Sequence, residues 1–288
     1  MGQELYIVTD STADLRGLEI AQSGVRVVPL TILFGEEFFY DGESLHSQAF
    51  YQKWRDEKVV PNTSQPSPNT FLRVYRSILD QHPHAQILSI HLSEKLSRTI
   101  QSAKLACSML PQSKQITILD SKTTSYGLGT IAMKLSEMAR SGANIKECIL
   151  KAETLLKSQS MYLIVDHLKY LRRMDRIGQA QFVVGSMFNF KPVLKFSTDT
   201  GHIYPIDRGF GRKNAVFKMF EDIELNFAGR EIQLSVMHAD AYDFADEIVK
   251  MAQTNLRVSE VDTRLASPVI GSNTGPGSCG ILVRCVDA

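Results

Sequence analysis

Leu5-Tyr6-Ile7-Val8-Thr9-Asp10-Ser11 is a short apolar, β-branched run that ends in an aspartate and a serine. Such a run is typical of a buried strand, and we expect a helix to start after it, near residues 12–13. The pattern recurs at Ile116-Thr117-Ile118-Leu119-Asp120-Ser121 and at Leu163-Ile164-Val165-Asp166, and a further short strand is expected at Ile87-Leu88-Ser89-Ile90. These repeats predict a sheet of buried strands whose ends lead into polar turns.

Segments with helical spacing lie among these strands, at residues 71–79, 99–109, 127–140 and 145–156. Gly142 fits a helix-ending position after the third segment, and Asn144 fits the N-cap of the fourth. Strands that alternate with helices indicate a mainly parallel sheet with helices on both faces. Ligands of such sheets bind beyond the carboxyl ends of the strands, where Asp10, Ser93 and Asp120 would lie.

The pattern changes after about residue 160. Strands are expected there at 182–195, 201–206 and 232–237, and helices near 214–225 and 241–254. We therefore predict a two-domain α/β protein. Residues 1–160 would form an N-terminal α/β domain, with the mainly parallel sheet and its flanking helices. Residues 161–288 would form a C-terminal α/β domain with a mixed sheet.

The composition favours a soluble globular protein. The 288 residues are 43% hydrophobic and 22% charged, which suits one large or two ordinary domains. The net charge of +1 gives no reason to expect nucleic acid or an anionic membrane as a partner. The four cysteines are scattered, with no C-x-x-C pair, which favours reduced thiols. With neither a leader pattern nor a membrane-spanning run, we expect a cytoplasmic protein without stable membrane insertion.

Pro61-Asn62-Thr63-Ser64-Gln65-Pro66-Ser67-Pro68-Asn69 holds three prolines, so it cannot be the interior of a helix or a central strand. Ser67 is expected to cap the following helix, with Pro68 at its first position. The hydroxyls and N–H groups of this stretch could bind an anion, because the helix dipole also favours negative charge there. A proline-rich connection with a capping serine explains the stretch as well.

Gly271-Ser272-Asn273-Thr274-Gly275-Pro276-Gly277-Ser278-Cys279-Gly280 is the most conspicuous glycine-rich loop, expected between strands at 268–270 and 281–283. Its glycines would let the backbone approach a ligand closely, and successive N–H groups could bind an anion. The loop has neither the phosphate-loop nor the dinucleotide pattern. A long turn between two strands is the plain alternative. Likewise, Ser93, Ser97 and Thr99 could be helix caps or ligand-facing hydroxyls.

Other candidate sites have less support. Arg172-Arg173-Met174-Asp175-Arg176 is a basic helix end, which suits a solvated face or an anion-binding site. A metal site could be proposed at His238, Asp240 and Asp243, but no further ligand accompanies them at the spacing typical of such sites. A Ser-His-Asp hydrolase is poorly supported, because Gly-x-Ser-x-Gly does not occur. Trp54 is expected in the core.

Seven segments together resemble the DegV family of bacterial fatty-acid-binding proteins, over essentially the whole chain. They occur in the family's order, and they are Ile7–Thr12, Thr63–Ser67, Leu96–Ala103, Leu119–Lys122, Leu168–Ile177, Lys191–Leu194 and Asn273–Gly277. The resemblance implies a two-domain α/β protein that buries one long-chain fatty acid, palmitate- or oleate-like, in a tunnel. It implies no cofactor, metal or catalytic residue.

The resemblance also implies that hydroxyls in the interdomain crevice hold the carboxylate. Thr63 matches the family's carboxylate-binding threonine, and Ser93 is chosen for the serine after the fourth strand, with Ser97 as the second choice. The ligand-binding residues expected from these matches are Thr63, Ser64, Ser93, Ser97, Asn273, Thr274, Gly275 and Arg176. Some members carry the lipid for a fatty-acid kinase, so a kinase partner is a further expectation.

The sequence departs from the family pattern at four positions. Arg98 and Asp175 stand where the family usually has glycine, and Asn273 stands where it usually has histidine. Phe210 aligns with a position at which kinase-linked members carry arginine, which weakens the expectation of a kinase partner. The change to Asn273 keeps a hydrogen-bond donor but removes a titratable group.

Two alternative functions stay open at this point. A phosphotransferase acting on a small hydroxylated substrate would use the Gly275 and Gly277 loop for phosphate, and Asp10 and Asp120 for Mg²⁺. A carrier for a different apolar acid would use Arg98 and Asn273 to reshape the head-group site. For a fatty acid, neutral hydroxyls rather than a cation are expected at the head group.

Overall fold

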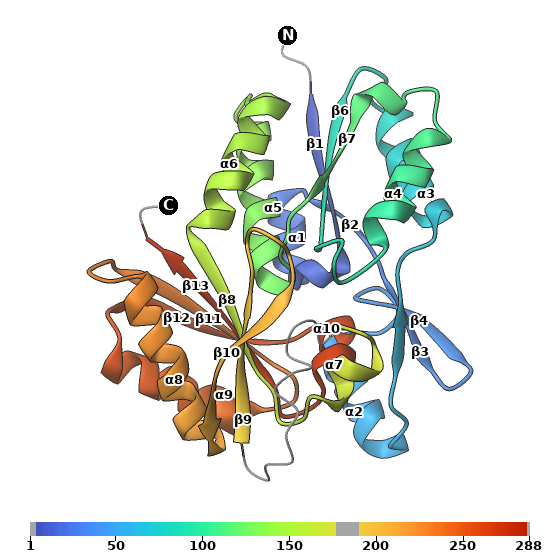
Figure 1. Ribbon diagram of the computed structural model, residues 1–288. Coiled ribbons are helices and arrows are strands. Elements are labelled where there is room, and N and C mark those ends of the chain that lie inside the picture. Colours follow the sequence, from blue (N-terminus) through green and yellow to red (C-terminus); the bar gives the residue numbers. More distant parts are fainter. Residues whose placement is uncertain (1–3, 177–189, 287–288) are drawn as a thin grey trace.

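The computed structural model describes residues 4–176 and 190–286, and it contains three sheets (Figure 1). The first is a four-stranded parallel sheet in the order β2-β1-β6-β7. Its strands are β1 (Leu5–Asp10), β2 (Arg26–Val28), β6 (Gln86–His91) and β7 (Ile116–Asp120). The strands expected at 5–9, 87–90 and 116–119 are therefore confirmed.

Helices cover both faces of this parallel sheet. Val8 and Ile87 pack on one face against α3 (Pro68–Leu79) and α4 (Thr99–Ser108). Ile7 and Leu88 pack on the other face against α5 (Ser125–Arg140) and α6 (Ile145–Lys157). The alternation of neighbouring strand residues between two cores is the pattern expected of a doubly covered sheet.

Local signals fix the ends of these helices. Ser67 caps α3 by accepting a hydrogen bond from the Thr70 N–H, and Asn144 caps α6 in the same way through Lys146 and Glu147. Gly142, with a φ of +92°, separates α5 from α6. All three features were predicted from the sequence.

The second sheet has six strands in the order β10-β9-β8-β13-β11-β12, and only β11 and β12 are parallel neighbours. Its strands are β8 (Gln159–Ile164), β9 (Phe190–Phe196), β10 (Ile203–Phe210), β11 (Ile232–His238), β12 (Val258–Leu265) and β13 (Cys279–Cys285). Helices α8 (Gly211–Asn226) and α9 (Tyr242–Asn255) cover one face. The mixed sheet is confirmed, but 163–165 belongs to it through β8 and not to the parallel sheet. The strand expected at 182–195 lies partly outside the described residues.

The third sheet was not predicted. It is antiparallel, in the order β4-β3-β5, and consists of β3 (Thr31–Phe34), β4 (Glu37–Tyr40) and β5 (Asn62–Ser64). Helix α2 (Ser47–Glu57) packs against it through Phe50 and Trp54, so Trp54 is a core residue as expected. Thr63 thus lies on an edge strand and not in a loop.

Two further expectations were wrong. The chain after β1 forms a short 3₁₀ turn, η1 (Ser11–Ala13), which ends because Asp14 adopts a left-handed conformation; α1 (Gly17–Ser23) starts later. Residues 268–270 belong to a helix, α10 (Pro268–Thr274), because Ser267 accepts a hydrogen bond from the Ile270 N–H and Pro268 occupies the first turn. The remaining elements are α7 (Lys169–Arg173) and η2 (Ser113–Gln115).

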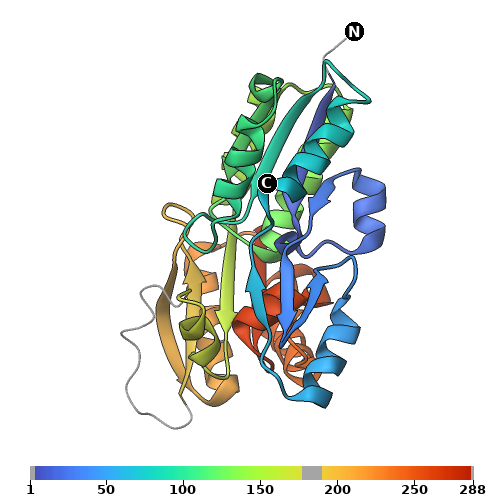
Figure 2. The same cartoon turned by 90° about the vertical axis from the view of Figure 1, so that its right-hand side faces the viewer.

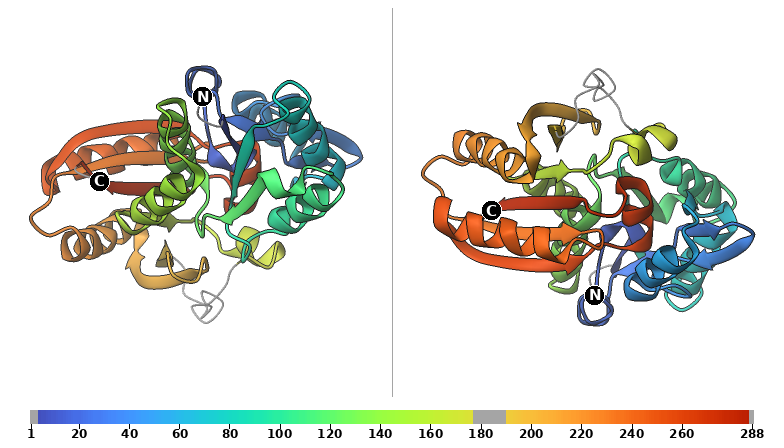
Figure 3. Two further views of the ribbon diagram at one scale, coloured as in Figure 1. Left: turned by 90° about the horizontal axis from the view of Figure 1, so that it is seen from above. Right: turned by 90° about the horizontal axis from the view of Figure 1, so that it is seen from below.

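The parallel sheet stands above the other two sheets, and α10 lies between the six-stranded and three-stranded sheets (Figures 1 and 2). The views from above and below show α8 and α9 on the outer side of the six-stranded sheet (Figure 3). The parallel sheet ends at Asp120 and the six-stranded sheet begins at Gln159. A domain boundary near residue 160 remains a prediction.

Candidate functional site

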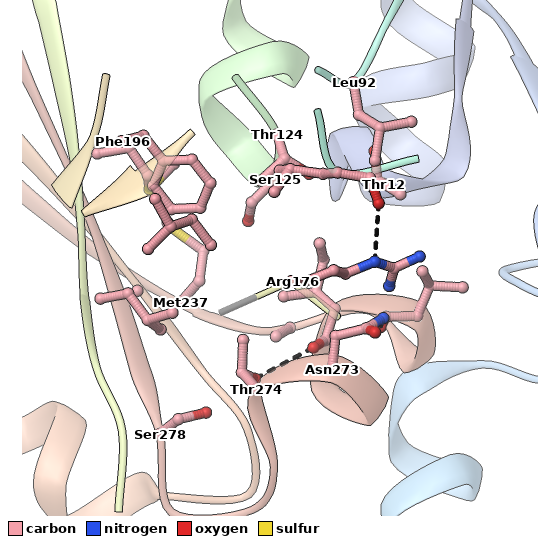
Figure 4. A pocket seen from close by; sticks show the side chains of 18 of the residues that line it. Thr12, Leu92, Thr124, Ser125, Arg176, Phe196, Met237, Asn273, Thr274 and Ser278 are labelled. Carbon is pink, nitrogen blue, oxygen red and sulfur yellow. Dashed lines mark hydrogen bonds between the residues drawn. The ribbon is translucent and has the colours of Figure 1, made fainter. Parts of the chain in front are cut away.

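A cavity lies on the face of the six-stranded sheet that α8 and α9 leave uncovered (Figure 4). It contains about 720 Å³ of space between protein atoms, part of it open to solvent. The strands supply apolar side chains to it at alternate positions. These include Met161 and Leu163 from β8, Phe196 from β9 and Met237 from β11.

Helix α10 closes one side of the cavity with polar side chains. Asn273 and Thr274 line the cavity, and Asn273 is only 6% exposed. The Asn273 amide nitrogen donates to the Val269 carbonyl at 2.6 Å and to the Thr63 hydroxyl at 3.4 Å. Thr63 therefore lies beside Asn273 although 210 residues separate them, and the Thr63 hydroxyl hydrogen stays available for another acceptor. The side-chain amide oxygen of Asn273 is buried without a partner among the described residues.

Two glycines allow α10 to pack this closely. A Cβ on Gly271 would lie 2.2 Å from the Tyr51 hydroxyl. Gly275 ends α10 with a φ of +80°, and a Cβ there would lie 2.1 Å from the Tyr170 ring. Close packing thus accounts for glycine at both positions, and the positive φ is a second reason at Gly275.

Arg176 brings a cation to the cavity wall. Its Nε donates to the Leu96 carbonyl at 2.8 Å, and within the described part of the chain no carboxylate pairs with it. Burial lowers the pKa of Arg176 to about 10, because the charged form is partly desolvated. This position differs from the expectation of a wall with neutral donors only. Asp175 has a φ of +52°, in the left-handed region that favours glycine, which explains the glycine of the family pattern. Aspartate tolerates this region better than most residues, so it can stand there in this chain.

Ser93 and Ser97 do not line the cavity. Ser93 is fully buried, its hydroxyl donates to the Gly201 carbonyl at 2.9 Å, and it accepts from the Lys95 N–H. The Ser97 hydroxyl is paired with Thr99 at 2.8 Å. Both serines stabilise the loop whose Leu96 carbonyl holds Arg176. Thr63, Ser64 and Gly275 also lie outside the cavity lining, although Thr63 contacts Asn273, which belongs to it. The Ser64 hydroxyl donates to the Gln65 carbonyl.

The sequence patterns missed several residues that line the cavity. Thr12, Thr124 and Ser125 line it near the start of α5, together with the apolar strand residues. Alternation along β8 and β11 predicts two faces for each strand, but it does not say which face borders a cavity. The sequence therefore held no signal for these residues beyond their burial.

The residues considered for phosphate and Mg²⁺ have other roles. Asp10 accepts from the Thr12 hydroxyl, the Leu92 N–H and His91, and the Gly277 N–H donates to Ala239. Asp120 accepts from the Lys122 N–H. In residues 4–176 and 190–286, no group of three or more His, Cys, Asp or Glu side chains is arranged to hold a metal ion.

Asp10 also belongs to a buried chain of side-chain hydrogen bonds. His91 Nδ1 lies 3.0 Å from Asp10 Oδ2, and His91 Nε2 lies 2.7 Å from Ser89 Oγ. Ser89 Oγ is in turn 2.8 Å from the Tyr75 hydroxyl. These four side chains are fully buried and none lines the cavity, so Ser89 cannot meet a substrate.

Other positions singled out by the sequence lie on the surface. Arg98 is exposed at the start of α4. Phe210 is 64% exposed, and its ring lies 5.6 Å from that of Phe190. Arg173 donates to the Asn62 side chain at 2.8 Å and so ties α7 to β5, whereas Arg172 is exposed. None of the helices in the described ranges has the length and apolar character needed to cross a bilayer.

Comparisons with known proteins agree with one another. The family model described as "Uncharacterised protein, DegV family" matches residues 4–285. A DegV domain-containing protein from Streptomyces coelicolor is 32% identical, over 98% of this chain and 99% of that protein. A Thermus thermophilus structure described as "Fatty Acid Binding of a DegV family Protein" has a TM-score of 0.88 and 31% identity, covering 99% of this chain and 100% of that one. The structure described as "DegV, a fatty acid binding protein from Bacillus subtilis" has a TM-score of 0.85 and 28% identity, covering 98% and 99%.

Proposed function

Because the chain belongs to the DegV family, we propose that it binds one long-chain fatty acid in the cavity beside the six-stranded sheet. The observation that carries this proposal is an apolar cavity with Asn273, Thr274 and Arg176 gathered on one side. The Thermus thermophilus and Bacillus subtilis proteins, both described as fatty-acid-binding, support it. The chain would act as a carrier with no chemistry of its own.

The physical case rests on the acyl chain. About sixteen carbons offer on the order of 12 kcal/mol of gross transfer free energy, at roughly 0.8 kcal/mol per methylene. Association and ordering remove several kcal/mol of this gain. The tail therefore sets affinity, and the head group sets orientation.

The head group would lie between Thr63 and Arg176. The Thr63 hydroxyl hydrogen is free to donate, and Arg176 has no carboxylate partner among the described residues. A fatty-acid carboxylate offers the acceptors that both groups need, and a charge-assisted hydrogen bond is stronger than a neutral one. We therefore keep Arg176, which the family resemblance also implied, as a head-group contact and no longer include Ser93.

Delivery to a kinase partner and a cytoplasmic location complete the proposal. All four cysteines are free thiols, which suits a reducing compartment. The exposed Phe210 stands where kinase-linked members carry arginine, so a kinase partner would have to accept an aromatic side chain there. A pull-down with a fatty-acid kinase subunit tests this part separately.

Native mass spectrometry of protein purified from bacteria tests the carrier role. We expect a bound lipid, released by organic extraction and identified as a long-chain acid. After delipidation, added palmitate or oleate should restore a one-to-one complex. An empty protein that also shows no mass shift with either acid would overturn the proposal, and magnesium-dependent ATP turnover by the chain alone would favour the phosphotransferase.

A further inference from the structure

The start of α5 forms a second polar region in the cavity wall. Thr124 and Ser125 line the cavity there, and Figure 4 shows them on the α5 side, whereas Asn273 and Thr274 project from α10. Thr124 is the N-cap residue of this 16-residue helix, yet its side chain makes no capping hydrogen bond. The first N–H groups of any α-helix lack intrahelical partners, so this end of α5 is electropositive.

Thr124 carries an unused hydrogen-bonding group. The residue is 6% exposed, and its hydroxyl oxygen is buried without a partner among the described residues. Buried hydroxyls in proteins are nearly always paired, and an unpaired one is destabilising. Phe196 and Met237, which belong to the same lining, are apolar and offer this hydroxyl no partner.

A carboxyl group already occupies this helix end. Asp14 accepts hydrogen bonds from the Ser125 hydroxyl and from the Ser267 N–H, and burial raises the pKa of Asp14. A second buried carboxylate beside Asp14 would be costly to ionise, whereas a neutral hydroxyl could both donate to and accept from Thr124. The group that suits this position is therefore polar and uncharged.

On the basis of the proposed function, we propose that this carrier accepts fatty acids that bear a hydroxyl on the acyl chain, with Thr124 as the residue that recognises it. The carboxylate would stay at Thr63 and Arg176, and the chain hydroxyl would pair with Thr124. Beside the apolar strand residues of this cavity, a chain hydroxyl without a partner would be penalised, so Thr124 decides whether such an acid is rejected or kept.

Calorimetric titration of the delipidated protein tests this inference. The probes are palmitic acid, a series of monohydroxy-hexadecanoic acids with the hydroxyl at different carbons, and hexadecanedioic acid. We expect at least one hydroxy acid to bind as tightly as palmitic acid, and the diacid to bind more weakly than both. Thr124→Val should weaken that hydroxy acid about 3- to 10-fold relative to palmitic acid, the range of one net hydrogen bond.

Two variants serve as controls. Thr124→Ser keeps the hydroxyl and should keep the preference. Thr130→Val lies on the same helix but outside the cavity lining, and its hydroxyl donates within the helix to Gly127, so it should not alter the ratio of the two affinities. Thermal melting of each variant checks the fold.

The outcomes separate the two proposals. If the wild type binds palmitic acid but rejects every hydroxy acid by 10-fold or more, or if Thr124→Val leaves all affinity ratios unchanged, the role of Thr124 is wrong and the carrier function stands. If the wild type binds no fatty acid at all, the proposed function itself fails.

Discussion

Arg176→Gln should raise the stability of the empty protein and weaken its binding of fatty acid. The guanidinium lines the cavity with one hydrogen bond, to Leu96, and with no carboxylate partner in the described chain. A pKa of about 10, against roughly 12.5–13.8 for a free arginine, corresponds to about 3 kcal/mol of unfavourable free energy for the charged form. Because the side chain is only half-buried, we expect about 1–2 kcal/mol of this as measurable destabilisation.

Glutamine can still donate to the Leu96 carbonyl but carries no charge. Urea unfolding of delipidated protein should therefore give a free energy of unfolding about 1–2 kcal/mol higher for Arg176→Gln. Calorimetric titration with palmitate should give an affinity about 10- to 100-fold lower, the range for a hydrogen bond to a charged group. The two effects have opposite signs, which a general loss of structure would not produce.

Arg172→Gln is the matched control, because Arg172 is an exposed arginine four residues away that makes no contact with the cavity. It should change neither quantity beyond about 0.5 kcal/mol. Unchanged palmitate affinity in Arg176→Gln, or a lower stability of its empty form, would refute the assignment of Arg176 as the partner of the carboxylate.

Three further substitutions test other parts of the structure. Thr63→Val should lower palmitate affinity about 10-fold by calorimetry with an unchanged melting temperature, and equal affinity would remove Thr63 from the site. Gly275→Ala should lower the free energy of unfolding in urea by about 2–3 kcal/mol, because the new Cβ meets the Tyr170 ring at a φ of +80°. Gly142→Ala, at a φ of +92° but in open space, should lower it by only about 1 kcal/mol. Equal losses in the two variants would contradict the steric reason. Asp41→Asn should stabilise the protein by about 1–2 kcal/mol at pH 8, because the Asp41 carboxyl group is buried and this burial raises the pKa of Asp41 well above its usual value. The folded protein then holds a proton that the unfolded chain releases above about pH 4, so wild-type stability falls as pH rises from there through the folded pKa of Asp41. The stability advantage of Asp41→Asn should therefore shrink toward pH 4. A stability advantage that does not change with pH would refute this origin.

Short-range patterns in the sequence predicted the parallel sheet and its helices well. Buried β-branched runs, the Ser67-Pro68 start of α3 and the Asn144 start of α6 each act within a few residues, and the structure follows them. The same Ser-Pro signature occurs at Ser267-Pro268, where the apolar residues that follow also suit a strand. A three-residue apolar run does not separate helix from strand, so the cap was the better guide.

Contacts between distant segments were harder to predict. The three-stranded sheet pairs Ile32 with Thr63 through strands of three or four residues, too short for alternation to show. The neighbourhood of Thr63 and Asn273 could be anticipated only from a family resemblance. Arg176 was taken from a motif, but its place in the cavity wall depends on Leu96, a contact across 80 residues.

The strand order of the six-stranded sheet has a consequence for biosynthesis. β13 lies between β8 and β11, and the ribosome makes it after every other strand of that sheet. A nascent chain that has not yet extruded β13 therefore holds two separate strand groups with exposed edges, at β8 and at β11. Such edges favour pairing with other chains, so translation that stalls before residue 279 should yield an aggregation-prone product that cannot be loaded with lipid.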